Sequence, residues 1–150
     1  MMTEATTIHM ETNVLQVATF YVGDLLLGIP IQQVQEINRQ LDLIPVPHAP
    51  SHLRGVINLR GEVVSVIDLC TVLGVESQKL SRSTRNLIIQ DQDQLVGLIV
   101  DDVADIVSVE TSEIRQPPAN FKGVSGKFFR GVCTTPSEII VILNLEETLG

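Results

Sequence analysis

Two groups of side chains have the types and spacing to suggest a metal site. The first is Asp101, Asp102 and Asp105, because carboxylate oxygens are common metal ligands. In an internal repeat described below, the matching positions carry Gln32, Gln33 and Glu36. We therefore interpret the acidic group as a polar helix face. The second is His48 with His52, but the proline between them prevents a regular helical pair and no third ligand is nearby. The sequence predicts no metal site.

Catalytic motifs are absent from the sequence in their common forms. It contains no Gly-x-Ser-x-Gly, no P-loop and no dinucleotide fingerprint. Cys70 and Cys133 have no close partner and no Cys-x-x-Cys spacing, so we interpret both as small core residues in a reducing compartment. Asp68 lies where a short helix would need an N-cap, which favours a capping role over acid catalysis. We expect no enzymatic activity and no cofactor.

Arg60 is a long charged residue at the predicted turn between two mainly apolar strands. It lies in the stretch 53–69, where β-branched residues predict two strands joined by a tight turn at Arg60 and Gly61. Glycine readily adopts the positive φ that such a turn needs. One interpretation of Arg60 is a solvated turn residue. The other is a guanidinium held on a stiff hairpin, which suits a bidentate contact with a carboxylate or with a carbonyl at a helix end. We expect Glu36 to be its internal partner.

The chain contains an internal repeat. A shift of 76 positions places 53–74 on 129–150, and a shift of 69 places 24–37 on 93–106. Gly55 then matches Gly131, and Gly28 matches Gly97, whereas the turn at 58–61 is not repeated at 134–137. Any two β segments resemble each other to some degree, but matched order and matched glycines favour a duplication. We expect a single domain over 14–150 with units of about 14–75 and 84–150.

Short strands dominate the predicted elements. Besides the two central strands, alternation and turn residues predict strands at 15–21, 25–29, 41–46, 86–90, 94–100, 128–133 and 139–143. The non-strand predictions are a disordered tail at 1–13, a helix at 31–37 begun by Pro30, a helical turn at 52–54 capped by Ser51, a linker at 76–85 and a loop at 111–124. Asp68 and Asn144 are predicted N-caps of short helices, and Gly74 ends the first. Positions 101–109 fit either a helical turn or a strand. The pattern predicts an all-β fold of two small barrels.

Composition restricts the partners. Hydrophobic residues make up 44% of the chain and the formal net charge is −8, which disfavours sequence-independent nucleic-acid binding and docking on anionic lipid. No signal peptide or spanning helix is visible, so we expect a cytoplasmic protein without membrane insertion. Aromatic residues make up only 3%, which disfavours polyproline recognition and base stacking. We expect a protein that binds other proteins.

The motifs resemble those of the CheW chemotaxis coupling-protein family. The stretch Gly-Val-Ile-Asn-Leu-Arg-Gly at 55–61, followed by Val-Ile-Asp-Leu at 66–69, is similar to the family's most recognisable signature. Flanking matches lie at 21–24, 28–29, 34–37, 96–101 and 103, so the resemblance covers 15–150. It implies an all-β fold of two SH3-like five-stranded β-barrel subdomains that share a hydrophobic seam, with short helices. It also implies a cytoplasmic adaptor, recruited to membrane-associated receptor arrays, that joins chemoreceptors to the histidine kinase CheA.

The resemblance also implies two partner surfaces. The cytoplasmic tip of a methyl-accepting chemoreceptor would bind a groove between the barrels, and the regulatory domain of a CheA-type kinase would pair barrel to barrel. By position, the receptor groove would use Val34, Glu36, Gly55, Arg60, Gly97 and Val103. Ser65 and Cys70 depart from the family pattern, which leaves open an adaptor of a type IV pilus or surface-sensing pathway. A free-standing regulatory module with a small ligand between the barrels is a further alternative.

Overall fold

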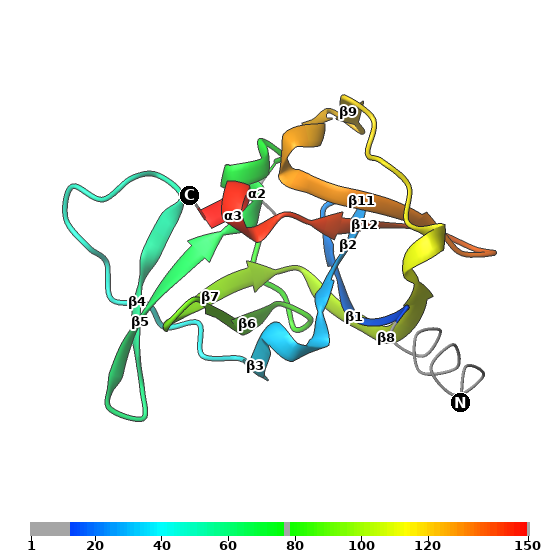
Figure 1. Cartoon of the computed structure of the whole chain (residues 1–150). Helices are drawn as coiled ribbons and strands as arrows, with labels where there is room; N and C mark the ends of the chain where they lie inside the picture. The colour runs from blue at the N-terminus through cyan, green and yellow to red at the C-terminus, as the bar shows by residue number, and fades with distance from the viewer. Residues whose placement is uncertain (1–12, 77–78, 150) are drawn as a thin grey trace, which may run out of the picture.

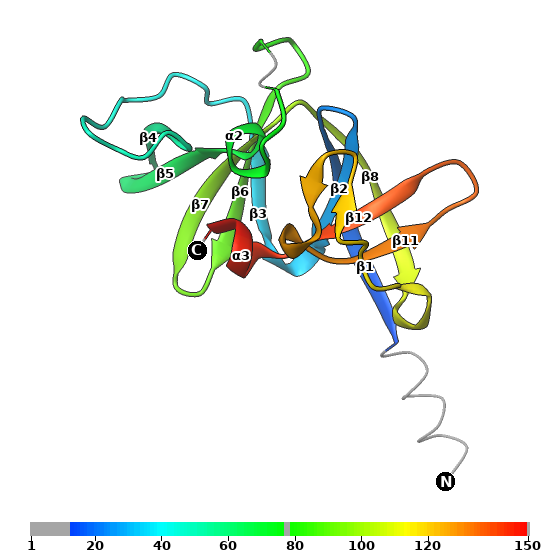
Figure 2. The same ribbon diagram turned by 90° about the horizontal axis from the view of Figure 1, so that it is seen from above.

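The computed structural model describes residues 13–76 and 79–149. Figure 1 and Figure 2 show two β-barrels side by side, with the short helices α2 (Leu69–Leu73) and α3 (Leu145–Leu149) over their junction. The predicted tail at 1–13 lies, apart from Asn13, outside the described residues, as do positions 77–78 of the predicted linker. In the part of the chain that is described, no helix is long and apolar enough to span a membrane.

Each barrel is built on one five-stranded sheet. The first barrel has the strand order β11 (Phe129–Thr134), β12 (Ile139–Leu143), β2 (Leu25–Pro30), β1 (Val14–Val22), β8 (Asp102–Glu110). The second has the order β3 (Val34–Asn38), β6 (Arg85–Asp91), β7 (Gln94–Val100), β5 (Glu62–Asp68), β4 (Leu53–Leu59). The smaller elements are η1 (Ile31–Gln33), η2 (Thr111–Glu113), η3 (Gly126–Phe128) and the paired β9 (Asn120–Phe121) and β10 (Val124–Ser125). The expected all-β fold of two five-stranded barrels with short helices is confirmed.

Each barrel takes strands from both halves of the sequence repeat. In the first barrel, β1 pairs with β8 and β2 pairs with β12, so early strands join late ones. In the second, β5 pairs in parallel with β7, and β3 pairs with β6. The order β11-β12-β2-β1-β8 corresponds, strand by strand through the repeat, to β4-β5-β7-β6-β3. Neither half of the chain can complete a barrel without the other.

Three groups of buried apolar residues hold the fold together. One fills the first barrel and includes Val17 and Ile140, and another fills the second and includes Ile57 and Ile88. The largest lies between the barrels and draws on β1, β2, β5, β6, β7, β12 and both α-helices. Since apolar burial is the main favourable term in folding, this central cluster gives the two barrels a shared apolar core. The predicted hydrophobic seam is confirmed.

The central hairpin forms as predicted, with β4 and β5 joined by Arg60 and Gly61. Both residues have positive φ, 50° for Arg60 and 86° for Gly61, as in the two-residue turns that match the twist of a hairpin. The side chain of Asn58 fastens the turn, because its Oδ1 accepts a hydrogen bond from the backbone N of Gly61 at 2.8 Å. The turn therefore fixes the direction in which the Arg60 side chain leaves the sheet.

Helix caps are confirmed at both predicted positions. The Asp68 carboxylate accepts a hydrogen bond from the backbone N of Cys70 at 3.0 Å, and Gly74 ends α2 in the left-handed conformation. In the second unit the Asn144 side chain accepts from the backbone N of Glu147 at 3.3 Å. The two α-helices therefore start in the same way.

Four other element predictions need correction or a decision. The predicted helix at 31–37 is wrong beyond Gln33, because β3 starts at Val34 and pairs with β6. The spacing of apolar residues at 31–37 also fits a helix. The β-branched residues there favour a strand, however, and this strand pairs with β6. The predicted strand at 41–46 is only a bridge between Ile44 and Val56. The predicted helical turn at 52–54 is wrong where β4 begins at Leu53, and the undecided stretch 101–109 is mainly strand β8.

Asn86 is a buried polar residue in the core of the second barrel. It is fully buried, and among the described residues its Oδ1 has no hydrogen-bond partner, while its Nδ2 donates to the Gln40 carbonyl at 3.3 Å. Its position matches Val17 in the repeat. A Cβ added at Gly97 would meet the Asn86 side chain, just as one added at Gly28 would meet Val17. In the first barrel the space beside the glycine is therefore filled by the apolar side chain of Val17.

We expect Asn86→Val to stabilise the protein by about 1 kcal/mol, because it removes an unsatisfied buried acceptor while keeping the shape used in the other barrel. Urea unfolding measures the change. Gly97→Ala is the matched control, and it should destabilise because the added Cβ would lie 2.5 Å from the Asn86 Oδ1. A loss of stability in Asn86→Val would show that the bond to Gln40 outweighs the unsatisfied oxygen.

Candidate functional site

Arg60 and Glu36 form an ion pair, as predicted. Arg60 Nη2 donates to Glu36 Oε1, and the second carboxylate oxygen, Oε2, accepts from Asn38 Nδ2 at 2.8 Å. Glu36 lies on strand β3 and not on the helix expected for it. Because β3 and β4 are at opposite ends of the sheet order, the ion pair joins the two edges of the sheet and closes the barrel at this end. A bond from Gln40 Nε2 to the Asn58 carbonyl at 3.1 Å supports the same closure.

The two members of the pair differ in exposure. The side chain of Glu36 is 25% exposed, whereas that of Arg60 is 75% exposed. Glu36 is fixed further by Asn38, so it orients the guanidinium from the protein side. The planar guanidinium has five N–H donors, so an incoming carboxylate or carbonyl can bind it without displacing Glu36. The arrangement can present a fixed positive charge to a partner.

The pKa of Glu36 is lowered from 4.5, first by the hydrogen bond from Asn38 and then by the one from Arg60. Because folding lowers this pKa, the stabilisation is present above the unfolded value and is lost as the pH falls through the folded one. We expect a ¹³C NMR titration of the Glu36 carboxyl to give a midpoint below 4.5. Asn38→Ala and Arg60→Gln should each raise it, whereas Arg82→Gln should leave it unchanged. A midpoint insensitive to both substitutions would contradict the observed contacts.

Val34 and Val103 occupy matching positions of the repeat on β3 and β8. Both are partly buried and pack against the central cluster. Each of their strands is at one end of its sheet order and pairs with a single neighbour within it. Figure 1 shows both strands on the lower side of the molecule. The structure therefore places apolar side chains on two edge strands, with β3 also carrying the carboxylate that holds Arg60.

Sequence reasoning missed two exposed apolar residues on these strands. Ile37 on β3 is 44% exposed and Ile106 on β8 is 61% exposed, and they too match in the repeat. The helix predicted at 31–37 would have Val34 and Ile37 on the same face. In a strand, Val34 and Ile37 point to opposite faces, and Ile37 points outward. A strand pattern with a period of two residues would therefore have predicted that Ile37 is exposed.

Gly55 and Gly97 are both buried, in β4 and β7. A Cβ at Gly55 would lie 2.6 Å from the carbonyl oxygen of Ile44, and one at Gly97 would meet Asn86. At the matching position of the first barrel, Gly131 is approached in the same way by Ile114 and Arg115. The small size of these glycines lets neighbouring chain segments pass close to the strands. Of the six residues predicted for the groove, the structure brings Arg60 and Glu36 into contact and places Val34 and Val103 on the edge strands.

Two carboxylates of the acidic group at 101–105 accept hydrogen bonds from backbone N–H groups. Asp101 Oδ2 accepts from the backbone N of Gly23 at 2.7 Å, and Asp102 Oδ1 accepts from the backbone N of Val103 at 2.8 Å. Asp102 and Asp105 lie on strand β8, so the polar helix face expected for the group is wrong. In the region the structure describes, no group of three or more His, Cys, Asp or Glu residues is arranged to hold a metal ion.

Comparisons with known proteins agree on one family. The CheW-like domain matches residues 16–150. The chain is 32% identical over 138 residues to the chemotaxis protein CheW of Rhizobium meliloti, covering 92% of this chain and 89% of that protein. It is 28% identical over 136 residues to the chemotaxis protein CheW of Treponema pallidum, covering 88% and 80%. The crystal structure of the scaffolding protein TtCheW from Thermoanaerobacter tengcongensis aligns with a TM-score of 0.81 and 29% identity, covering 87% of this chain and 84% of that one. With the fold, the motifs and these matches in agreement, the chain belongs to the CheW-like domain family.

Proposed function

We propose that this protein is a non-enzymatic adaptor that couples membrane chemoreceptors to a CheA-type histidine kinase. The observation that carries the proposal is the exposed guanidinium of Arg60, which Glu36 and a two-residue turn hold in a fixed direction beside the edge strand β3. Membership in the CheW-like family and similarity to a scaffolding protein support the same function. The adaptor works in the cytoplasm and is recruited to receptor arrays.

In this proposal the helical tip of the receptor binds beside β3 and β8. Val34 and Val103 contact its apolar side chains, and Arg60 contacts a carboxylate or a carbonyl at the end of a receptor helix. Gly55 and Gly97 contribute by shaping the strands below the surface, since both are buried. A guanidinium that is already oriented loses less conformational entropy on binding than a free one. This pre-organisation is the role we assign to Glu36.

The kinase binds elsewhere on the molecule in this proposal. Its regulatory domain has a related two-barrel shape and pairs barrel to barrel with the adaptor. Because the two partners use different surfaces, one adaptor can hold both at once. In this proposal the protein positions its two partners and catalyses no reaction, which agrees with a sequence that lacks the common catalytic motifs.

A retention assay tests this function. An immobilised receptor tip should retain the kinase regulatory domain when the adaptor is added, and should release it when the adaptor is omitted. If the two partners exclude each other from the adaptor, the proposed coupling is wrong.

A further inference from the structure

Arg130 is the repeat counterpart of Arg54, but the two arginines have different surroundings. Arg54 Nη1 donates to Asp68 Oδ2 at 2.8 Å, and the Asp68 side chain is only 6% exposed. The position that matches Asp68 is Asn144, which keeps the capping bond to the helix but carries no charge. Among the described residues, no carboxylate lies within ion-pair distance of Arg130. At these positions the second unit keeps the arginine but carries an uncharged asparagine in place of the aspartate.

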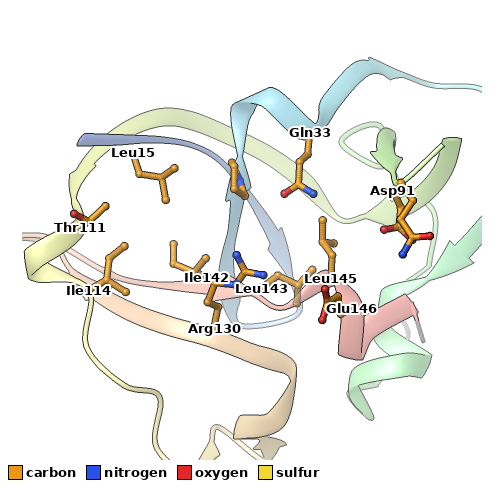
Figure 3. A pocket seen from close by; sticks show the side chains of 12 residues that line it. Leu15, Gln33, Asp91, Thr111, Ile114, Arg130, Ile142, Leu143, Leu145 and Glu146 are labelled. Atoms are coloured by element: carbon orange, nitrogen blue, oxygen red, sulfur yellow. The ribbon is translucent and has the colours of Figure 1, made fainter. Parts of the chain in front are cut away.

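Arg130 lines a cavity of about 630 Å³. Figure 3 shows its guanidinium directed into the cavity from β11, with Gln33 reaching in from the opposite side. The exposed apolar lining of the cavity is formed by Leu15 and Ile114, which are partly buried, whereas Ile142 and Leu143 are only 2% exposed. A cation with adjacent apolar walls suits a carboxylate attached to an aliphatic group, because both parts of such a ligand find a complement.

The charges around the cavity limit the kind of ligand. Asp91 and Glu146 lie toward one end of it, and the chain as a whole carries a formal net charge of −8. A free small anion would gain one cation here and would be repelled by the surrounding field. A segment of a protein can place one carboxylate on Arg130 and cover the apolar wall with neighbouring side chains. Its other residues can carry charges complementary to Asp91 and Glu146.

We propose that this cavity is a docking site for a partner-protein segment that presents an Asp or Glu side chain to Arg130 and an aliphatic side chain to the wall formed by Leu15 and Ile114. The site shares no residue with the six positions proposed for receptor binding. It is therefore a second, independent recognition surface, and it does not depend on the proposed coupling function.

An NMR titration of the full chain tests the site with a defined probe, the peptide acetyl-Leu-Glu-Leu-amide. Backbone amide signals of Leu15, Thr111 and Leu143 should shift on addition of the peptide. Arg130→Gln should weaken binding by about fivefold or more, since a charge-assisted contact is lost. Arg54→Gln is the matched control and should leave the affinity unchanged, because Arg54 lies outside the cavity. Gln33→Glu places a carboxylate opposite Arg130 and should also weaken binding, because it competes with the ligand for the guanidinium and repels the ligand carboxylate.

Three outcomes would overturn the proposal. The first is equal binding of acetyl-Leu-Gln-Leu-amide, which would show that the carboxylate is not recognised. The second is unchanged binding in both Arg130→Gln and Gln33→Glu with the fold intact by thermal melting. The third is the same set of shifts from pentanoate at equal concentration, which would make the cavity a site for free small carboxylates and not for a protein segment.

Discussion

Arg60→Glu should weaken binding of the receptor tip by about 2 kcal/mol or more, roughly thirtyfold in affinity, if the contact is desolvated in the complex. The substitution replaces the proposed recognition charge with its opposite and places two carboxylates beside each other. Its effect on the fold should be small, no more than about 1 kcal/mol, since pairs this exposed contribute little to stability. Binding of the kinase regulatory domain should change much less. Titration of the variant against both partners measures all three effects.

Two further variants separate recognition from folding. Arg82→Glu changes the charge of another exposed arginine and should leave receptor binding nearly unchanged. The exchange Arg60→Glu with Glu36→Arg restores an internal pair but not the exposed cation, so it should keep the fold and still bind the receptor tip weakly. Unchanged receptor affinity in Arg60→Glu would show that Arg60 is a solvated turn residue whose pair with Glu36 only closes the barrel.

Residues 1–78 expressed alone should be unfolded or aggregated. This fragment contains β1 to β5, but β8 and β12 of the first barrel and β6 and β7 of the second come from the rest of the chain. In particular, β5 would lose its parallel neighbour β7 and β2 would lose β12. The central cluster would lose its members from β6, β7, β12 and α3. Circular dichroism and thermal melting of the purified fragment measure the result.

Mixing the fragments provides the control. Residues 1–78 refolded together with 79–150 should regain strand content and a cooperative thermal transition, because every strand pair is again available. Proteolytic cleavage of the intact protein at this boundary should leave both fragments associated. A soluble 1–78 fragment with a sharp transition of its own would contradict the strand exchange between barrels.

Much of the fold could be predicted from the sequence because local signals agreed with the final packing. The central hairpin carried β-branched strands and a glycine at the turn, and both features survive in the structure. The caps at Asp68 and Asn144 were likewise local, since each side chain bonds a backbone N–H a few residues on. Where side chain and backbone decide a conformation within a few residues, the sequence alone is sufficient.

The errors arose where distant partners decided the outcome. The stretch 31–37 has apolar spacing that fits a helix, but β6 offers Val34 and its neighbours a strand partner. The exchange of strands between barrels was also invisible, because a repeat reveals which segments are related and not which of them pair. For the candidate site, the pairing of Arg60 with Glu36 was correctly predicted although the secondary structure around Glu36 was wrong. The pairing could be predicted because the two side chains carry opposite charges, which does not depend on the backbone conformation at Glu36.

Simultaneous binding of the two partners tests the coupling proposal most directly. The receptor tip is immobilised, the adaptor is bound to saturation, and the kinase regulatory domain is titrated over the surface while its retention is recorded. We predict that the kinase domain binds the loaded surface with micromolar affinity, roughly −8 kcal/mol, and that this affinity equals the one measured for free adaptor. Omission of the adaptor, or its replacement by Arg60→Glu, should abolish or strongly reduce retention. Displacement of the adaptor from the receptor tip as the kinase domain is added would show a shared surface and would contradict the proposed function.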